Sequence, residues 1–456
     1  MVLFLTPQSA RDPRRALALQ VLSAALDAAD PAQAIRRLIF RSDDTLWVDG
    51  TAYDLAHCRR VIVIGGGKAG ASMASAMEDL LEDRITAGWV NVKYGYTEPT
   101  DLITIHQAGH PVPDAQAVSG TQSMISLLRD ITADDLVICL ISGGGSALMS
   151  LPVPGISLEE LQTLTDLLLR SGAPIEAINA VRKHLSRISG GQLARLAYPA
   201  RVITLILSDV VGSPLDVIAS GPTVPDPTTY AHALAVIERY GLGEQVPGAI
   251  RQHLRRGVSG SVDETPKLGD PEFANVHNLI IADNARAAQA AVMQAESLGF
   301  HTLLLSTYIE GEAREVAKVL AALSKEIATV GRPVARPACL ILGGETTVTV
   351  RGSGRGGRNQ ELALAAALAI EGQESVMIAS LATDGTDGPT DAAGGLVDGT
   401  TITRGRELGL SARAALDNND AYPYLAAAGD LLMTGPTNTN VNDLMAVFVF
   451  DDVALA

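Results

Sequence analysis

Cysteine is scarce in this sequence: Cys58, Cys139 and Cys339 are the only three in a chain of 456 residues. A disulfide framework or a zinc site needs closely spaced sets of thiols, and these three are too few and too scattered for either. Cys139 and Cys339 fall inside apolar, strand-like runs, so we expect them to be buried thiols. This cysteine usage favours a cytoplasmic protein.

Aromatic residues and positive charge are also in short supply. Phe, Trp and Tyr make up 4% of the chain, and 35 Lys and Arg stand against 51 Asp and Glu, which gives a net charge of −16. A nucleic-acid-binding face needs a basic surface or aromatic stacking platforms, so we expect no nucleic-acid partner. Because the overall charge repels anions, an anionic substrate would need cations concentrated at its own site.

Long apolar runs are missing too. No stretch approaches the roughly 20 residues of a membrane-spanning helix, and no basic segment precedes the short apolar N-terminus. We therefore expect neither a membrane protein nor a signal peptide. The length exceeds what one hydrophobic core usually holds, so about two domains are expected, and a homo-oligomer stays open.

Strand patterns alternate with helical patterns along the chain. Runs that are apolar at nearly every position occur at 60–64, 136–141 and 201–207, and helical patterns follow them. Such runs indicate strands buried on both faces, and their alternation with helices predicts an α/β fold with a doubly wound, Rossmann-like sheet. In folds of this kind, ligands bind at the carboxyl ends of the strands.

A second series of strands and helices begins near residue 278. We therefore predict an N-terminal domain of residues 1–245 and a C-terminal α/β domain of residues 275–456. The boundary is expected within about 241–275, where the sequence is polar and contains Gly and Pro.

The first glycine-rich turn, residues 65–70, has the Gly-x-Gly-x-x-Gly spacing of a dinucleotide fingerprint. However, no carboxylate for a ribose hydroxyl stands about 20 residues further on, where the chain reads Trp89 to Lys93. Lys68 lies inside the turn, where its ammonium could reach a bound anion. It is followed by Ala69, so there is no P-loop motif. The turn is either an anion site with Lys68 or a plain tight turn.

A second turn, Ser142-Gly143-Gly144-Gly145-Ser146, follows the second buried strand. Three consecutive glycines let the backbone amides wrap an oxyanion, and they cost folding entropy that a mere turn does not require. A plain turn remains the alternative. The Gly-x-Ser-x-Gly pattern of a nucleophilic serine is absent.

A third glycine-rich stretch, residues 351–361, contains three arginines and precedes a helical run at 362–370. Guanidinium groups and the amides at a helix N-terminus both suit a phosphate or a carboxylate. The alternative is a solvated glycine loop with incidental arginines.

Several carboxylates also follow strands. Asp209 stands at the tip of the third strand, and Glu345 follows two glycines in a strand-rich region. A loop with Asp384, Asp387 and Asp391 offers oxygen ligands suited to Mg²⁺, of which we expect at most one to work. Two histidines, His110 and His184, have no partner at metal spacing, and we expect hydrogen-bonded structural roles for both. Turns, cations and carboxylates at strand ends favour phosphoryl transfer.

Eight stretches in order along nearly the whole chain resemble the class II glycerate kinases, the MOFRL-domain family, whose members are sometimes labelled hydroxypyruvate reductases. They are IGGGKAGASMAS (64–75), AGHPVPDA (108–115), ISGGGSALM (141–149), NAVRKHLSRISGGQ (179–192), LSDVVGSPLDVIASGPTVPDP (207–227), LGGETTVTVRGSGRGGRNQEL (342–362), ATDGTDGPTDAAGGL (382–396) and TGPTNTNVNDLM (434–445).

The resemblance implies a kinase that uses ATP and Mg²⁺ to phosphorylate the 2-hydroxyl of D-glycerate, giving 2-phosphoglycerate and ADP. It also implies an N-terminal Rossmann-like domain, a C-terminal MOFRL α/β domain and an active site in the cleft between them. Small molecules would be the partners. An NAD(P)H-dependent hydroxypyruvate reductase is the alternative, and a non-catalytic anion-binding protein is a third reading.

Carried over residue by residue, the resemblance gives the candidate site. The catalytic candidates are Lys68, Arg358 and Asp209. The ligand-binding candidates are Gly66, Gly67, Ser142, Gly143, Gly144, Gly145, Ser146, Glu345, Asn359 and Asn440, with Asp384 for the metal. We expect Arg358 and Lys68 to neutralise the phosphoryl group or hold the carboxylate of glycerate, and residues 142–146 to cradle nucleotide phosphates. One of Asp209 and Asp384 would hold Mg²⁺ while the other orients or deprotonates the hydroxyl, and domain closure would assemble the site.

Overall fold

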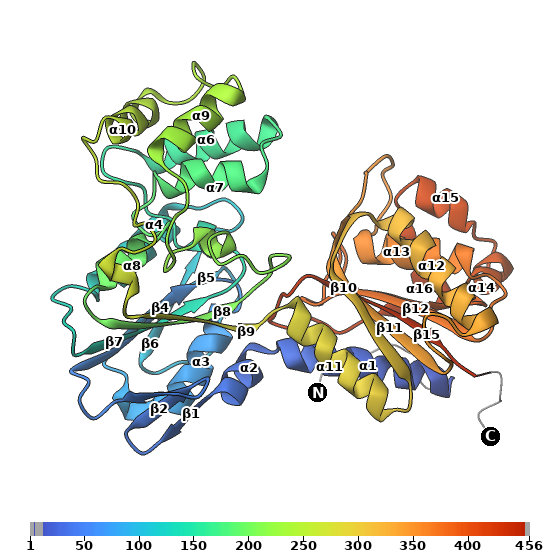
Figure 1. Cartoon of the computed structure of the whole chain (residues 1–456). Helices are drawn as coiled ribbons and strands as arrows, with labels where there is room; N and C mark the ends of the chain where they lie inside the picture. Colours follow the sequence, from blue (N-terminus) through green and yellow to red (C-terminus); the bar gives the residue numbers. More distant parts are fainter. Residues whose placement is uncertain (1–3, 5–11, 452–456) are drawn as a thin grey trace. The chain divides into compact units, whose positions relative to one another are not determined.

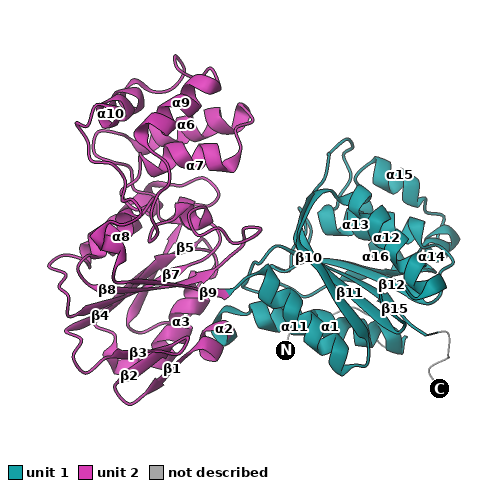
Figure 2. Cartoon of the chain, in the orientation of Figure 1, with its two compact units in different colours: residues 1–33, 282–456 teal, residues 34–281 magenta. Residues whose placement is uncertain are grey.

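The computed structural model of this chain describes residue 4 and residues 12–451. The chain divides into two compact units (Figure 2): unit 2 is residues 34–281, and unit 1 combines residues 1–33 with residues 282–456. Each unit has its own six-stranded sheet covered by helices (Figure 1). The predicted α/β class with two domains is confirmed.

Unit 2 is built on a sheet of strand order β6-β5-β4-β7-β8-β9. Its strands are β4 (Arg60–Gly66), β5 (Ala87–Lys93), β6 (Ile103–Ala108), β7 (Asp135–Ile141), β8 (Arg201–Leu207) and β9 (Val276–Ala282). The pairs β4–β5, β5–β6, β4–β7 and β7–β8 are all parallel. The strand order runs outward in both directions from β4 and β7, so the switch point of this doubly wound sheet lies between these two strands.

Helices complete unit 2. Those nearest the sheet are α3 (Gly70–Leu81), α4 (Ala115–Ser126), α5 (Gly145–Leu148) and α8 (Gln192–Ala197). A separate helical cluster consists of α6 (Leu158–Arg170), α7 (Ile175–Lys183), α9 (Tyr230–Arg239) and α10 (Gly248–Val258), and it has an apolar core of its own around Leu164 and Ile250. The short helix η3 (Ile218–Ser220) lies in the loop after β8. The helical patterns expected at α3, α6, α7 and α9 are confirmed, whereas α4, α5, α8 and α10 were not predicted.

A small antiparallel meander precedes the sheet of unit 2, and it too was not predicted. It follows helix α2 (Pro31–Leu38) and consists of β1 (Ile39–Ser42), β2 (Thr45–Val48) and β3 (Thr51–Asp54). These strands are only four residues long and half exposed, so they lack the continuous apolar run by which the longer strands are recognised.

The division into units differs from the predicted ranges 1–245 and 275–456. Strand β9 completes the sheet of unit 2 instead of opening the second half. Helix α1 (Pro13–Ala29) belongs to unit 1, where it packs along α11 (Asn284–Ser297). Arg15 on α1 is 3% exposed and pairs there with Asp398 at 2.8 Å and with Asp430 at 3.0 Å. Residues this far apart in sequence leave no local sequence pattern that would predict their contact. The boundaries of the two units could therefore not be predicted from the sequence.

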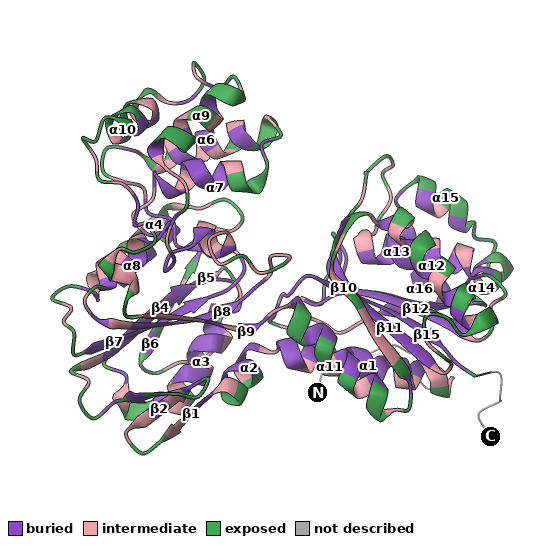
Figure 3. Cartoon of the chain, viewed as in Figure 1, coloured by how far each residue is buried: buried purple, intermediate pink, exposed green. Residues whose placement is uncertain are grey.

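Unit 1 has a mixed sheet of order β10-β11-β15-β12-β13-β14. Its strands are β10 (His301–Glu312), β11 (Ala338–Thr347), β12 (Val376–Ala382), β13 (Gly394–Asp398), β14 (Leu431–Leu432) and β15 (Asp443–Val449). Helices α1 and α11 lie along one face in Figure 1, and the remaining helices lie on the other. These are α12 (Ala313–Val330), α13 (Arg358–Ala369), α14 (Thr401–Glu407), α15 (Ala412–Asp417) and α16 (Ala421–Ala428). Figure 3 shows the strands of this sheet largely buried between the two layers.

Helix α13 begins earlier than expected. It was predicted from 362, but it starts at Arg358, so Arg358 is the first helical residue and not part of the loop. Strand β11 likewise continues through Gly343, Gly344 and Glu345, where a break was predicted. Both differences place the candidate residues on regular elements, which hold side chains more firmly than loops.

The structure also describes the buried cysteines and the helices that were considered from the composition. Cys139 and Cys339 are buried free thiols, and burial raises the pKa of Cys139 to about 12. Of the helices within the described part of the chain, none is long and apolar enough to cross a membrane.

Candidate active site

The two glycine turns of unit 2 meet at the switch point of its sheet. Gly66 at the end of β4 pairs in register with Ile141 at the end of β7. Past these positions, a Cβ on Gly67 would overlap the Oγ of Ser142, so the turns approach as closely as backbone allows. Ser142 itself is buried, and its Oγ accepts a hydrogen bond from the amide of Ala69 at 3.0 Å.

The amides of the first turn are already engaged. Those of Gly67, Lys68 and Gly70 donate to the carbonyls of Asn91 (3.1 Å), Gly143 (2.8 Å) and Gly67 (3.1 Å), and that of Ala69 donates to Ser142 as described. A dinucleotide site would need such amides free for a pyrophosphate. The structure therefore gives Gly66 and Gly67 a packing role in place of the predicted ligand contact.

The second turn has amides to spare. Among the residues that the structure describes, the backbone N–H groups of Gly143 and Gly144 have no acceptor. Gly144 has φ +84°, a left-handed conformation that glycine adopts without strain. The Oγ of Ser146 lies 3.0 Å from the Oγ of Ser220, which ties the turn to the loop after β8. Of the two turns, the second is the one equipped to hold an oxyanion.

Asp209 and Lys68 flank this open turn. A Cβ on Gly143 would overlap the Oδ2 of Asp209, so the carboxylate lies directly against the glycine. Burial raises the pKa of Asp209, and the nearby Lys68 ammonium partly opposes that rise. A cation, free amides and a carboxylate with increased proton affinity thus converge at the ends of β4, β7 and β8, as predicted from the sequence.

His110 lies on the other side of the same turn. A Cβ on Gly144 would come within 2.8 Å of the Cδ2 and 2.9 Å of the Nε2 of the His110 ring. Burial, together with Lys68 and Lys93, lowers the pKa of His110 to about 4, so the imidazole is neutral at physiological pH. The prediction of a hydrogen-bonded structural role is wrong for His110, whose ring has no hydrogen-bond partner in the described chain.

His184 shows the behaviour expected of a structural histidine. Its Nδ1 lies 2.7 Å from the carbonyl oxygen of Ala180, and its Nε2 lies 2.9 Å from the Oε1 of Glu264. The ring is 1% exposed. The predicted structural role is confirmed for His184.

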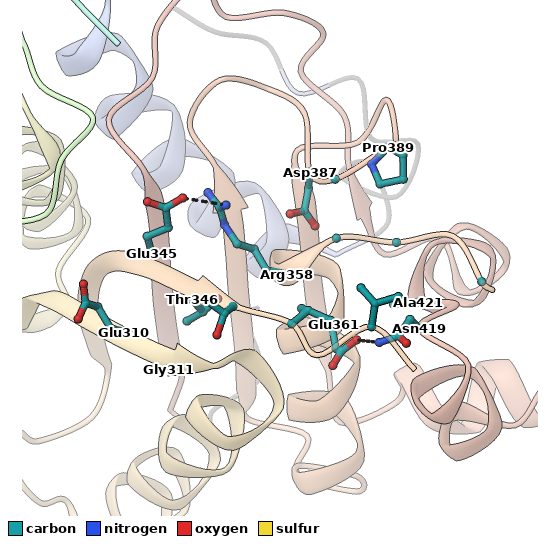
Figure 4. Close-up of a pocket in the computed structure, with 17 residues that line it drawn as sticks. Glu310, Gly311, Glu345, Thr346, Arg358, Glu361, Asp387, Pro389, Asn419 and Ala421 are labelled. Carbon is teal, nitrogen blue, oxygen red and sulfur yellow. Dashed lines mark hydrogen bonds and ion pairs between the residues drawn. The ribbon is translucent and has the colours of Figure 1, made fainter. Parts of the chain in front are cut away.

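In unit 1 the candidate residues gather around Arg358. Its Nε and NH2 groups donate to Oδ2 and Oδ1 of Asp443 at 2.6 and 2.9 Å, and its NH1 lies 3.0 Å from the Oε1 of Glu345 (Figure 4). Strands β11 and β15 are antiparallel, with Gly344 opposite Asp443, which brings the end of one strand to the start of the other. A guanidinium carries five N–H groups, so two remain for a ligand.

The charges of this cluster depend on one another. Burial acts to lower the pKa of Arg358, but the hydrogen bonds and charges of Asp443 and Glu345 outweigh it and raise that pKa. Burial raises the pKa of Asp443, and Arg358 opposes the rise. Removing Arg358 would therefore leave Asp443 buried and uncompensated.

Most of the loop before Arg358 is held by the protein itself. The amides of Arg351 and Gly352 donate to the Oδ1 of Asn419 at 2.7 and 3.0 Å, and that of Arg355 donates to Asp420 at 2.7 Å. Between them, the amides of Ser353 and Gly354 donate to Asn418. Residues 351–355 therefore serve as a fixed support, while the amides of Gly356 and Gly357 have no acceptor among the described residues.

The N-terminus of α13 is occupied as well. The Asp387 carboxylate accepts the amides of Asn359 and Gln360 at 3.2 and 2.8 Å. Burial raises the pKa of Asp387 to about 6, even though these N–H groups stabilise its charged form. The prediction that the helix N-terminus binds a ligand anion is corrected accordingly, because Asp387 takes that position.

A cavity of about 880 Å³ opens beside the cluster. Figure 4 shows the Arg358 side chain reaching toward Glu345, with Glu361 and Asn419 joined further along. Carboxylates outnumber cations along its wall, which is formed by Glu310, Gly311, Glu345, Thr346, Thr347, Val348, Val350, Gly354, Gly356, Gly357, Arg358, Glu361, Asp387, Gly388, Pro389, Asn419 and Ala421. An anion bound there could meet the two remaining N–H groups of Arg358 and the amides of Gly356 and Gly357, for which the described residues offer no acceptor.

Two of the predicted ligand-binding residues, Asn359 and Asn440, make contacts within the protein instead. Asn359 has no exposed surface and donates to Asp387 and Asp443, so it positions carboxylates and cannot meet a ligand directly. The Oδ1 of Asn440 accepts the amide of Asn442 in a local turn.

Asp384 follows β12 and is the candidate magnesium ligand. Its Oδ1 accepts the amide of Thr386 at 3.0 Å, and its Oδ2 makes no hydrogen bond within the described residues. In those residues no three His, Cys, Asp or Glu side chains are grouped as metal ligands. Mg²⁺ commonly takes one or two carboxylates and completes its shell with water and substrate phosphates. Asp384 fits a metal that arrives with a nucleotide.

Asp443 was missed at the sequence level, and His110 was expected only in a structural role. Asp443 opens a fully buried strand, and a carboxylate at such a position needs a cationic partner, which is the signal that could have found it. His110 lies two residues after β6 and precedes Pro111, in a loop that starts at the carboxyl edge of the sheet. This position after a strand is the signal that His110 shares with Asp209.

Comparisons with known proteins agree with the two-part organisation. Residues 17–255 match a family described as a domain of unknown function (DUF4147), and residues 338–443 match the MOFRL family. The chain is 44% identical to a glycerate 2-kinase of Pyrococcus horikoshii, over 95% of this chain and 97% of that protein. It is 43% identical to a putative hydroxypyruvate reductase of Agrobacterium vitis, over 86% and 87%.

A solved structure extends the likeness to three dimensions. The crystal structure of a glycerate kinase from Thermotoga maritima superposes with a TM-score of 0.87 at 42% identity, and the match covers 96% of this chain and 99% of that one.

Proposed function

This chain belongs to the glycerate kinases that carry a MOFRL domain, and it phosphorylates glycerate; we propose that it transfers the γ-phosphoryl group of ATP to the 2-hydroxyl of D-glycerate. The 2-position follows from the names of the relatives from Pyrococcus horikoshii and Thermotoga maritima, which are glycerate 2-kinases. Small molecules are the proposed partners and the cytoplasm the proposed location, in keeping with three free thiols.

One observation carries the assignment of roles: the open turn at Gly143 and Gly144 lies between Lys68 and Asp209. Phosphoryl transfer depends on positioning and on charge neutralisation more than on a covalent intermediate. Free amides and an ammonium provide the neutralisation, and a carboxylate beside them provides a proton acceptor.

In the proposed reaction the 2-hydroxyl oxygen of glycerate attacks the γ-phosphorus. The new bond joins that oxygen to phosphorus, the bond from phosphorus to the β,γ-bridging oxygen breaks, and ADP leaves. The hydroxyl proton passes to the carboxylate of Asp209, whose raised pKa suits it to accept a proton. Lys68 and the amides of Gly143 and Gly144 hold the phosphate oxygens in place.

Asp384 would hold Mg²⁺ through its unengaged carboxylate oxygen. When bound, the metal would neutralise charge on the nucleotide phosphates. This division of roles leaves Asp209 as the base, because Asp209 and not Asp384 lies against the open turn.

Arg358 would act on the same substrates through its two remaining N–H groups. Asp443 contacts the Nε and NH2 of the guanidinium, and Glu345 contacts its NH1. The side chain is therefore already held in place, and little side-chain entropy is lost when a ligand binds. Either the transferring phosphoryl group or the carboxylate of glycerate suits this fork.

A reductase is the weaker alternative. A nicotinamide dinucleotide would need free amides in the first turn, and those of residues 67–70 are bonded within the protein. A ribose carboxylate about 20 residues further on is also missing from the sequence.

The test is a coupled assay on purified protein with D-glycerate, ATP and Mg²⁺. Enolase added directly, without a mutase, reports 2-phosphoglycerate, while ADP is followed separately. A parallel reaction contains hydroxypyruvate and NADH. We expect ADP and an enolase-competent product in equal amounts. Oxidation of NADH without release of ADP would overturn the proposal.

The roles are tested with Lys68→Met and Asp209→Asn, using Lys267→Met as the control at a lysine that bonds to Thr228 and Thr265. We expect the first two to lower kcat by roughly a hundredfold. A double variant of Lys68 and Arg358 that loses less than the product of the single losses would support action on one transition state.

A further inference from the structure

His110 begins the loop between β6 and α4, and its ring reaches the second glycine turn of unit 2. The ring edge lies against Gly144, and Asp209 lies against the preceding glycine, Gly143. The two side chains therefore adjoin the two residues whose amides have no acceptor in the described chain. Neither the packing of a core nor the anchoring of a loop explains a histidine in this place, because the ring makes no polar bond.

The missing hydrogen bond is unusual for this protein. Every other buried or half-buried histidine of unit 2 has a ring partner: His106 with Gln116, His184 with Ala180 and Glu264, His253 with the carbonyl of His184, and His277 with Tyr53. Buried polar groups in proteins are normally satisfied, and the exceptions mark positions that a ligand or water completes. The His110 ring and the amides of Gly143 and Gly144 are three such groups side by side.

The surrounding charges determine what the ring can do. Lys68 and Lys93 act on it together with burial, so it stays neutral and carries one N–H and one lone pair. The nearest loop carboxylate, Asp114, is engaged by the hydroxyl of Tyr94 at 2.8 Å and the amide of Ala117 at 2.9 Å. An anion beside the ring would thus meet two ammonium groups and an unused N–H.

We infer that His110 is a ligand-binding residue, whose neutral imidazole donates its N–H to an oxyanion held by the Gly143–Gly144 turn beside Lys68. The oxyanion is a carboxylate or a phosphate, and the two sources are glycerate and the nucleotide. A neutral donor adds a directional hydrogen bond without a third positive charge, so product can still leave. The inference rests on the proposed function of this turn.

The kinetic test uses His110→Ala and His110→Gln. The glutamine keeps a side-chain N–H of similar reach, whereas the alanine removes it. Losing a hydrogen bond to a charged group should raise KM for one of the two substrates by about tenfold to a hundredfold in His110→Ala, and less in His110→Gln. The affected substrate identifies the oxyanion. His57→Gln, at an exposed histidine, is the matched control.

A binding measurement separates this inference from the proposed function. In protein labelled with ¹³C-histidine, the ring signal of His110 is assigned by its loss in His110→Gln. D-Glycerate and Mg²⁺–ATP are then added separately to the Lys68-containing wild type. We expect one of them to shift the His110 signal and leave that of His57 unchanged.

The outcomes are distinct. If neither ligand shifts the His110 signal, and both KM values in His110→Ala stay within twofold of wild type, the inference is overturned while the kinase proposal stands. If wild type makes no phosphoglycerate but ATP still shifts the signal, the proposed function fails and the binding role of His110 holds. A thermal unfolding curve for each variant confirms that it is folded.

Discussion

The two glycine-rich turns that follow strands in the two units look alike in sequence and differ in structure. In the turn of unit 2, residues 142–146, the amides of Gly143 and Gly144 have no acceptor among the described residues. In the loop of unit 1, residues 351–357, the first five amides donate to the segment 418–420, and only those of Gly356 and Gly357 have no acceptor in the described chain. The loop of unit 1 is thus mostly held by the protein itself, and its two open amides lie next to the guanidinium-bearing Arg358.

The comparison shows that a glycine in a loop indicates where the backbone comes close to another part of the protein, and does not by itself indicate a binding site. In unit 2 the glycines come close to the side chains of Ser142, Asp209 and His110, and the amides of Gly143 and Gly144 keep no acceptor in the described residues. In unit 1 a Cβ on Gly352 or Gly354 would overlap Asn418 or Asp420, so the glycines make room for a protein segment. The hydrogen-bond acceptors of the backbone amides therefore decide the function of each loop.

The largest expected effect is that of Arg358→Ala, which removes the one cation of the unit 1 cluster. We expect kcat to fall by at least roughly a hundredfold. Stability should also fall by about 3–5 kcal/mol, because Asp443 stays buried without its partner. Steady-state kinetics and urea unfolding check the two parts.

The double variant Arg358→Ala with Asp443→Asn serves as the control. It should recover most of the stability and none of the turnover, which separates the two roles of the arginine. Near-normal turnover in Arg358→Ala would remove the residue from the reaction.

A smaller effect is expected for Gly143→Ala, which keeps the backbone of the open turn and adds a methyl group against the Oδ2 of Asp209. Displacing a reacting group by about 1 Å can cost up to a hundredfold in rate. We expect kcat to fall by about tenfold to a hundredfold with the unfolding midpoint nearly unchanged. Gly243→Ala is the matched control, since a Cβ there meets open space. Equal kcat in both variants would contradict the placement of Asp209.

Asn419→Gly tests the closed loop of unit 1. Asn419 has φ +53°, so glycine keeps the backbone relaxed while the acceptor of two amides and the donor to Glu361 are lost. The free energy of unfolding should fall by about 2 kcal/mol, measured in urea. Asn438→Gly, at φ +57°, is the control for the backbone change. If the two variants were equally stable, the loop would not depend on segment 418–420.

The smallest effect is the pH dependence that His110 imposes. Its pKa in the folded protein, about 4, lies below the ordinary value of 6.5, so the folded state favours the neutral ring. The associated stability is fully present above pH 6.5 and is lost as the pH falls toward 4. His110→Gln removes this loss.

Between pH 7 and pH 5 the melting temperature of His110→Gln should therefore gain on that of wild type. The gain should be on the order of 1–2 °C, since the ring is only half buried and solvent screens its charge. Thermal unfolding at both pH values measures it, with His57→Gln beside it. If the melting temperatures of His110→Gln and wild type differ by the same amount at both pH values, the folded protein does not hold the His110 ring neutral.

Much of this arrangement was predictable because the strands are buried on both faces. Apolar runs such as 60–64 and 136–141 gave the sheet of unit 2, and the position of polar residues just past them gave Lys68, Asp209 and the second turn. Glu345 was noticed because it follows two glycines in a strand-rich region. Arg358 was noticed because it lies in a glycine-rich stretch before a helix, and the family resemblance pointed to it as well.

What escaped prediction depends on partners distant in sequence. The Asn418–Asp420 segment lies more than 60 residues from the amides it accepts, and Asp443 is 85 residues from Arg358. No local pattern reports such pairs, so the loop of unit 1 looked open. The short, half-exposed strands at 39–54 and the placement of α1 were missed because local apolar periodicity does not determine them.

The packing of α1 into unit 1 affects how the protein is made. Strand β15, at the centre of the sheet of unit 1, leaves the ribosome long after α1. At about 5–20 residues per second, roughly 20–90 seconds separate the two. Unit 2, one continuous segment, can fold in that interval, while Arg15 waits for Asp398 and Asp430. A fragment that starts at residue 282 would lack this helix and leave the two aspartates without Arg15.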